Sequence, residues 1–175
     1  MASDQCLIRT RSSEETRRLA ETLGRMLGRG DTISLTGDLG AGKTTFTQGL
    51  AIGLGIPAGV VVNSPTFTIL AEHPEGRVPL YHFDVYRLSG AGDLYDLAFD
   101  EYVDGNGVVV VEWADKIAEA LPPDTLYISM AFPESLGRHA ADYATDDREI
   151  QFRAAGARSA ALVNALAESV QEVTP

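Results

Sequence analysis

The sequence contains one cysteine and two lysines in 175 residues, and it has no long run of apolar residues. The single cysteine, Cys6, cannot form an internal disulfide bond, which excludes a disulfide scaffold and a cysteine-rich zinc domain and favours a reducing compartment. No stretch approaches the roughly 18 consecutive apolar residues of a membrane-spanning helix, and the first residues lack the pattern of a signal peptide. We therefore expect a cytoplasmic protein that does not enter a membrane.

Basic residues are scarce relative to acidic ones. Fourteen Lys and Arg stand against 25 Asp and Glu, which gives a formal net charge of -11. A protein that holds nucleic acid by its phosphates needs a basic face, so we expect no binding to DNA and no strong direct binding to RNA. Association with a basic partner protein stays open.

The predicted elements alternate between strands and helices along most of the chain. Ser12 and Glu15 form a capping-box pattern at the start of a helix, and Thr32–Thr36 is a short β-branched run typical of a strand. Val108–Val111 has no polar face, which indicates a central parallel strand covered on both sides. Further strands are predicted at Phe67–Ala71, Leu80–Tyr86, Thr125–Phe132 and Arg148–Arg153, and further helices from Lys43 to Leu54, at Asp93–Tyr102 and at Ala157–Val170.

This order of elements predicts an α/β fold. We expect a P-loop NTPase-like three-layer sandwich with a mostly parallel central sheet and antiparallel strands at one side. The sequence shows no internal repeat and no linker, so we expect residues 1–175 to form one domain.

One motif carries specific chemistry. Residues 37–44, GDLGAGKT, fit the pattern GxxxxGK[ST] between a predicted strand and a predicted helix. Glycines let the backbone direct its N–H groups at phosphate oxygens, Lys43 supplies a positive charge, and the Thr44 hydroxyl is suited to Mg²⁺. The residues expected to bind the nucleotide here are Asp38, Leu39, Gly40, Ala41, Gly42, Lys43, Thr44 and Thr45.

The sequence lacks the motif with which P-loop proteins recognise guanine, and this indicates the base of the bound nucleotide. Guanine-specific P-loop proteins carry an Asn/Thr-Lys-x-Asp pattern, which this sequence lacks. Lys116 is the only lysine outside the P-loop, and it stands in the unrelated context of residues 114–117, ADKI. We therefore expect ATP, with Mg²⁺, as the bound nucleotide.

Two acidic residues are candidates for a catalytic role in such a site. Glu112 follows the Val108–Val111 strand directly, at the end of a strand where ligands bind in open α/β sheets, although it could also be an ordinary exposed glutamate. Asp84 shares one strand face with His82 and Tyr86 by period-two alternation. That face either lines a polar cleft or is simply exposed to solvent.

Two further residues lie close to these acids in the sequence. Thr66, in the segment Ser64–Phe67, resembles the loop with which P-loop switch proteins sense the terminal phosphate, but a plain proline turn explains it equally well. Trp113 follows Glu112 and either packs in the core or covers the nucleotide or a partner. His73 and His139 have no companions at metal-ligand spacing, and we expect both at the surface.

The ordered motifs resemble the TsaE family of P-loop ATPases, which serve the synthesis of threonylcarbamoyladenosine in tRNA. The motifs are SEET at 13–16, GDLGAGKTT at 37–45, SPTF at 64–67, YHFDVYR at 81–87 and VEW at 111–113. The resemblance covers residues 12 to about 132, and the predicted strand and helix within 148–172 match the family only loosely.

The resemblance implies a role for each matched residue. It implies that Lys43 binds phosphates, that Thr44 and Glu112 hold Mg²⁺, and that Asp84 acts in catalysis or orients water. It also implies a switch role for Thr66, a functional role for Trp113 and a place for Thr16 near the base. The family's partners are the TsaD and TsaB proteins, with tRNA held only indirectly through that complex.

Two other functions fit the same residues. A small-molecule kinase uses the same P-loop and acidic base, and 138–158 is the only segment in which its arginine-rich lid could lie. A nucleotide-gated binding module with negligible hydrolysis is the third hypothesis.

Overall fold

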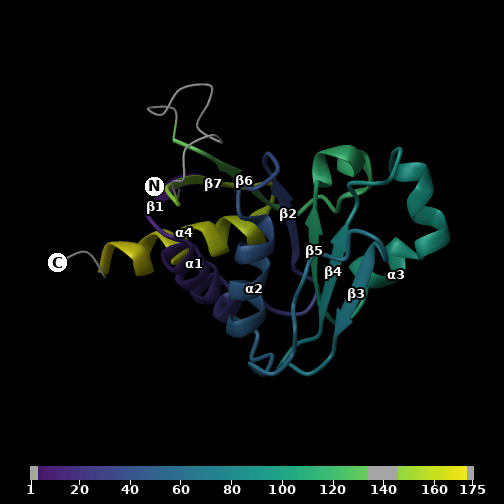
Figure 1. Ribbon diagram of the computed structural model, residues 1–175, viewed down its shortest axis with the longest axis horizontal. Coiled ribbons are helices and arrows are strands. Elements are labelled where there is room, and N and C mark those ends of the chain that lie inside the picture. The colour runs from purple at the N-terminus through teal and green to yellow at the C-terminus, as the bar shows by residue number, and fades with distance from the viewer. Residues whose placement is uncertain (1–3, 134–145, 173–175) are drawn as a thin grey trace.

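Seven strands form one sheet in the computed structural model, which describes residues 4–133 and 146–172 (Figure 1). In chain order the elements are β1 (Gln5–Thr10), α1 (Ser13–Met26), β2 (Thr32–Thr36), α2 (Lys43–Gly53), β3 (Leu70–His73), β4 (Leu80–Asp84), η1 (Ala91–Leu97), α3 (Phe99–Val103), β5 (Val108–Glu112), η2 (Ala114–Ala120), β6 (Leu126–Ala131), β7 (Arg148–Ala154) and α4 (Ala157–Glu172).

The sheet is parallel at its centre and antiparallel at both edges. The strand order is β1-β7-β6-β2-β5-β4-β3, and the pairs from β6 to β4 are all parallel. β7 and β3 run against their neighbours, so five of the seven strands point the same way. The predicted α/β class with a mostly parallel sheet is confirmed. Antiparallel strands were expected at one side only, and β3 adds one at the other edge.

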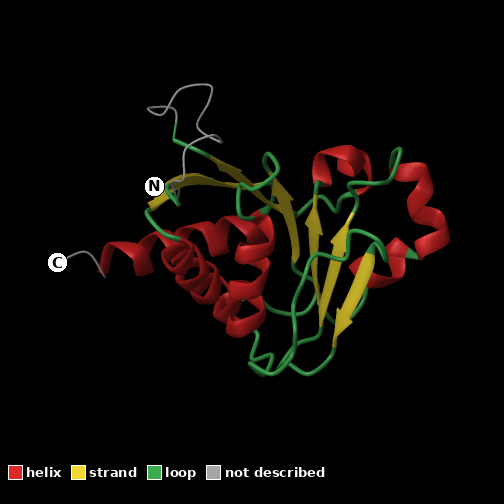
Figure 2. Ribbon diagram, in the orientation of Figure 1, coloured by secondary structure: helices red, strands yellow, loops and turns green. Residues whose placement is uncertain are grey.

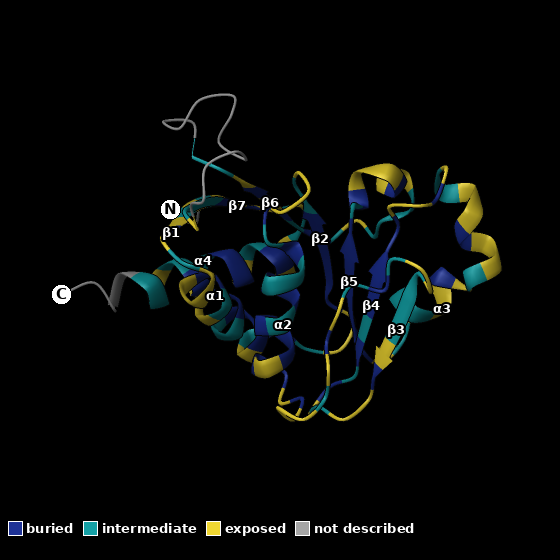
Figure 3. Cartoon of the chain, in the orientation of Figure 1, coloured by how far each residue is buried: buried dark blue, intermediate teal, exposed yellow. Residues whose placement is uncertain are grey.

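Helices cover the two faces of the sheet, giving the predicted three layers (Figure 2). α1, α2 and α4 pack on one face, where Leu23, Phe46 and Leu166 meet β-strand residues such as Ile33 in one apolar cluster. η1, α3 and η2 cover the β3–β5 half of the other face around Phe83. Figure 3 shows the buried residues concentrated in the central strands and in the inner sides of the helices.

Several strands and helices begin or end at other residues than the sequence predicted. The strand predicted at Phe67–Ala71 is β3 at Leu70–His73, because Ile69 has a positive φ of 68° and its N–H donates to the carbonyl of Pro65 in a turn. The helix predicted at Asp93–Tyr102 is interrupted at Ala98, which adopts a left-handed conformation between η1 and α3. β1 and η2 were not predicted.

α1 and α2 approach each other at backbone distance because glycines face the contact. A Cβ on Gly49 would lie 2.6 Å from the Cβ of Ala20 and would clash with the carbonyl oxygen of Arg17, and a Cβ on Gly24 would lie 2.5 Å from the carbonyl oxygen of Leu50. No other residue type fits these positions without moving a helix. The contact fixes the start of α1 beside the start of α2.

The C-terminal helix is fastened to the body by charged groups. The Arg158 guanidinium forms two hydrogen bonds with the buried Asp31 carboxylate, at 2.9 and 2.8 Å. The Asp124 carboxylate accepts the N–H groups of Arg158 and Ser159 at the start of α4. The pKa of Asp124 is lowered, first by hydrogen bonding with the Ser159 side chain and then by these N–H groups. In residues 4–133 and 146–172 no helix has the length and apolar character that crossing a membrane requires.

The α1–α2 contact predicts that Gly49→Ala destabilises the protein. Alanine favours a helix over glycine by about 1 kcal/mol, so propensity alone would stabilise the variant. The added methyl has no room, and we expect the free energy of unfolding to fall by about 1–3 kcal/mol, measured by urea denaturation. Gly59→Ala is the control, since nothing lies within 4 Å of a Cβ at that position. Equal stabilities of the two variants would contradict the contact.

Candidate functional site

The P-loop connects the end of β2 to the start of α2. Gly42, the residue before α2, has a φ of 104°, a left-handed conformation that side chains disfavour and glycine accepts. The loop is thereby folded over the N-terminus of α2, where unpaired N–H groups and the helix dipole favour an anion. The sequence motif therefore has the structural context that phosphate binding requires.

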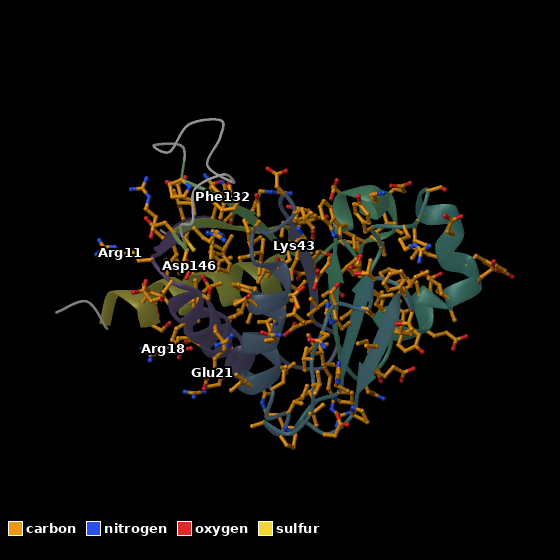
Figure 4. The ribbon with its side chains drawn as sticks, viewed as in Figure 1. Arg11, Arg18, Glu21, Lys43, Phe132 and Asp146 are labelled. Atoms are coloured by element: carbon orange, nitrogen blue, oxygen red, sulfur yellow. The ribbon has the colours of Figure 1, made fainter. Side chains whose placement is uncertain are left out.

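Lys43 lies at the first position of α2 and is 5% exposed (Figure 4). Its Nζ donates to the carbonyl oxygens of Gly37 at 2.6 Å and Asp38 at 3.0 Å, and it lies 3.8 Å from the centre of the Trp113 ring. Burial lowers the pKa of Lys43, while nearby carboxylates, above all Glu112, act in the opposite direction. An anionic ligand would therefore favour the charged ammonium further.

A cavity of about 330 Å³ lies beside Lys43. It gathers residues from the P-loop, the segment after residue 62, and the ends of β4 and β5. Its lining residues are Leu39, Gly40, Gly42, Lys43, Thr44, Thr45, Ser64, Thr66, Asp84, Glu112 and Trp113. The structure thus brings most of the predicted site residues to one place.

Glu112 lies at the end of β5 with its carboxylate buried. Its Oε1 lies 2.8 Å from Nε2 of His82 and 3.3 Å from the Thr44 hydroxyl, which donates to it. Glu112 is 2% exposed and His82 is fully buried. The alternative of an exposed strand-end glutamate is therefore wrong, and so is that of a solvent-exposed face around His82.

Asp84 faces the same cavity from the end of β4, level with Glu112 in the parallel register. Its Oδ2 accepts the hydroxyl of Ser64 and, at 2.9 Å, that of Thr66, while its Oδ1 accepts the backbone N–H of Tyr86 at 2.9 Å. The carboxylate therefore holds two loops in place. Movement of the Ser64–Phe67 segment would change its surroundings directly.

Trp113 forms one wall of the cavity. It has a positive φ of 62°, unusual for a bulky residue, and its ring packs against that of Tyr86 with 4.8 Å between centroids. Such backbone strain persists only where surrounding contacts enforce it. Trp113 is partly buried: it packs against the apolar cluster around Phe83 and also lines the cavity, so the two interpretations of this residue do not exclude each other. Asp38 is exposed and lines neither of the two cavities at the P-loop.

Thr16 lies on the other side of the P-loop. It lines a second cavity of about 180 Å³ with Gly40, Thr45 and Arg148. The Thr16 side chain is 2% exposed, and its hydroxyl lies 2.7 Å from that of Thr10. The close α1–α2 contact places it there, next to the loop but away from Glu112.

Sequence reasoning missed three features and misplaced one. Ser64 and the His82–Glu112 contact join separate chain segments, which no local pattern reveals. Arg148 lies in a predicted strand and in the candidate lid segment 138–158, but no local pattern reveals its contact with the P-loop. His73 was expected at the surface and is buried, 7% exposed, because it pairs with Leu80 of β4, which belongs to the buried apolar cluster.

Some expectations concern residues that the structure does not describe. His139 and the first part of the proposed lid segment, 138–145, lie outside the described residues. The described part of that segment, 146–158, forms β7 and the start of α4 and belongs to the sheet and its cover.

The oxygen atoms in the cavity fit Mg²⁺. Thr44 and Glu112 offer a hydroxyl and a carboxylate directed at each other, the hard ligands that Mg²⁺ prefers. Within the described residues no group of three or more His, Cys, Asp or Glu side chains is placed to hold a metal. A magnesium ion would therefore need further ligands from phosphate and water, as is usual for Mg²⁺ with nucleotides.

Known proteins are similar in sequence to this chain over most of its length. The family model described as "Threonylcarbamoyl adenosine biosynthesis protein TsaE" matches residues 10–140. The protein named tRNA threonylcarbamoyladenosine biosynthesis protein TsaE of Bacillus subtilis is 48% identical over 150 residues, which are 86% of each chain. The protein of that name from Treponema pallidum is 46% identical over 121 residues, 69% of this chain and 87% of the other.

The fold has a solved relative as well. The crystal structure of Bacillus subtilis YdiB has a TM-score of 0.77 and 41% sequence identity, and the match covers 95% of this chain and 96% of that one. The described sheet and its helices therefore have an experimental counterpart over nearly their whole length.

The buried His82–Glu112 contact predicts that His82→Leu destabilises the protein. The Glu112 carboxylate would lose a hydrogen-bond partner in a buried place, which costs about 1–3 kcal/mol of unfolding free energy. His73→Leu is the matched control, because Nε2 of that buried histidine has no partner among the described residues and its loss should cost little. Urea denaturation of both variants measures the difference, and a His73→Leu variant as unstable as His82→Leu would refute it.

Proposed function

The chain belongs to the TsaE family of threonylcarbamoyl adenosine biosynthesis proteins, and from this we propose that it binds and hydrolyses ATP in the modification of tRNA. The observation that supports this most is the meeting of the Lys43 ammonium, the Thr44 hydroxyl and two buried carboxylates around one cavity. A phosphate-binding loop alone would serve a passive binder, but acids at this distance from it serve phosphoryl transfer.

Magnesium is part of the proposal because of the charge in the cavity. Its lining includes one ammonium, Lys43, against the carboxylates of Asp84 and Glu112. A triphosphate would meet repulsion there unless a cation accompanied it. We expect Thr44 and Glu112 to hold Mg²⁺, which would neutralise charge on the phosphates when bound.

The chain's own residues have separate parts in this reaction. N–H groups at the start of α2 and the Lys43 ammonium bind the phosphates. Asp84, held by Ser64 and Thr66, orients the attacking water, whose oxygen bonds to the γ-phosphorus as the bond to the β–γ bridging oxygen breaks. The products are ADP and inorganic phosphate. His82, which contacts Glu112 Oε1 through its Nε2, keeps the Glu112 carboxylate in place.

A partner at the mouth of the cavity fits the exposed apolar residues there. Leu39 is 85% exposed and lines the cavity, and Phe67, next to the lining residue Thr66, is 84% exposed. Exposed apolar groups gathered near a site indicate a surface for another protein. We propose that the partner is the complex of TsaD and TsaB, that it stimulates turnover, and that tRNA is reached only through it.

Phosphate release from ATP tests the proposed chemistry. Lys43→Ala should lose ATP binding, because Lys43 is the one positively charged side chain among the described residues that line the cavity. Asp84→Ala and Glu112→Gln should still bind ATP, but their partner-stimulated turnover should fall about 100-fold or more, because the first loses the group that orients the water and the second loses a carboxylate that would hold Mg²⁺. The assay is run alone and with a reconstituted TsaD–TsaB pair.

Binding of a labelled ATP analogue, with and without EDTA, separates affinity from turnover in the same variants. Thr45→Ser, which keeps a hydroxyl at the neighbouring position, is the control for a general disturbance of the loop. Unchanged stimulated turnover in both acidic variants would overturn the assignment of the site. Transfer of phosphate to a small hydroxyl compound in place of water would favour the kinase hypothesis.

The docking surface predicts that Phe67→Ser reduces stimulation by the partners and leaves ATP affinity unchanged. The side chain is exposed, so its loss should not disturb folding, but the partner would lose apolar area at the cavity mouth. Tyr95→Ser is a matched control, since Tyr95 is 90% exposed on η1 and does not line the cavity. Titration of TsaD–TsaB in the phosphate-release assay gives the half-saturating concentration for each. Equal half-saturating concentrations in both variants and the wild type would contradict the proposed docking surface.

A further inference from the structure

Arg148 joins the C-terminal part of the chain to the P-loop. It is the first residue of β7, far from the loop in sequence. Its Nε donates to the carbonyl oxygen of Ala41 at 2.9 Å and one terminal nitrogen donates to that of Gly40 at 3.0 Å. The guanidinium therefore holds two successive peptide groups of the loop at once.

The side chain that makes these bonds is itself fixed in place. Its guanidinium lies over the Phe132 ring, 4.2 Å from the centroid, and it also donates to the backbone carbonyl of Asp147 at 2.8 Å. Figure 4 labels Phe132 and Asp146 on the same side of α2 as the β6–β7 end of the sheet. A planar guanidinium with a fixed stem is well suited to hold two acceptors in one geometry.

The direction of these bonds matters for the phosphate side of the loop. In a planar trans peptide the carbonyl and the N–H point in opposite directions. A guanidinium can only donate, so Arg148 holds the Ala41 carbonyl on its own side of the loop. The N–H of the same peptide group, that of Gly42, therefore points away from Arg148. Gly42 lines the cavity with Lys43, so this N–H is directed to the side where phosphates are expected.

Glycine at this point makes such an external hold necessary. Gly40 and Gly42 both have positive φ, at 80° and 104°, and glycine residues rotate between conformations at little cost. A loop of this kind gains affinity for an anion when its N–H groups are already oriented, since the cost of ordering is removed from binding.

We propose that Arg148 is a positioning residue for the P-loop: it holds the loop from its outer side and orients the Gly42 N–H for the phosphates of the nucleotide, while the Ala41 N–H donates within the loop to the carbonyl of Asp38. The proposal rests on the proposed function, because it assumes that the loop binds ATP. It gives β7, which lies beyond the span matched by the family model, a part in nucleotide binding.

Two probes test it with the 175-residue chain: Mg-ATP and inorganic tripolyphosphate, each measured by calorimetry. Arg148→Ala should weaken both by about tenfold or more, since two charge-assisted hydrogen bonds are lost. Tripolyphosphate lacks the base and ribose, so an equal loss with both probes assigns the effect to the phosphate side. Arg148→Lys keeps a positive charge and should recover part of the affinity.

Arg153→Ala is the matched control. Arg153 lies on the same strand and its guanidinium is 4.3 Å from the Tyr127 ring centroid, but it points to the opposite face of the sheet and lines neither cavity at the P-loop. Melting temperatures without ligand show whether each variant is folded. If Arg148→Ala does not fold, the affinities of Arg148→Lys are compared with those of the wild type instead.

Each outcome of these measurements either supports or overturns the role of Arg148. Affinities of Arg148→Ala within twofold of wild type would overturn the inference, and so would an equal loss in Arg153→Ala. A loss for Mg-ATP with none for tripolyphosphate would also overturn it, because it would indicate contact with the base or ribose. Wild-type protein that binds neither probe would overturn the proposed function and this inference with it.

Discussion

The parallel register of β2, β5 and β4 is the constraint on which the site depends. Glu112 pairs with Leu35 on one side and with Asp84 on the other, so the three strands end at one level. The P-loop leaves β2 one residue later, and α2 carries Lys43 and Thr44 back over the same edge. A shift of one residue in β4 or β5 would turn Asp84 or Glu112 to the opposite face of the sheet. The placement of the two acids beside the P-loop therefore follows from backbone pairing before any side-chain contact is considered.

The sequence predicted the centre of the fold better than its edges. Val108–Val111 is a buried central strand as expected, because a run without a polar face has only one place in an α/β sheet. The cap of α1 also forms as predicted, with the Ser12 hydroxyl accepting the N–H of Glu15. β1 was missed because its six residues mix charged, polar and apolar types, and only pairing with β7 makes them a strand.

The candidate site divides in the same way. The P-loop could be read from the sequence because its backbone conformations demand particular residues at fixed spacing. The burial of Glu112 could not be predicted, since it depends on His82 and Thr44 from other segments. Strand alternation did place His82 and Asp84 on one face, but it could not decide between cleft and solvent, because that depends on contacts with other segments, such as Glu112 and Ser64. Arg148 and the P-loop are joined across more than 100 residues, a relation that only the folded sheet creates.

The glycine contact between α1 and α2 has a mechanical consequence. Side chains between two helices usually act as a compliant layer that absorbs small displacements by changing rotamer. Here backbone meets backbone at Gly24 and Gly49, and that layer is absent at these points. A force applied to the exposed side of α1 is therefore transmitted to α2 without loss in rotamer changes, and α2 begins at Lys43. A displacement of the outer surface of α1 would therefore move the phosphate-binding end of α2 directly.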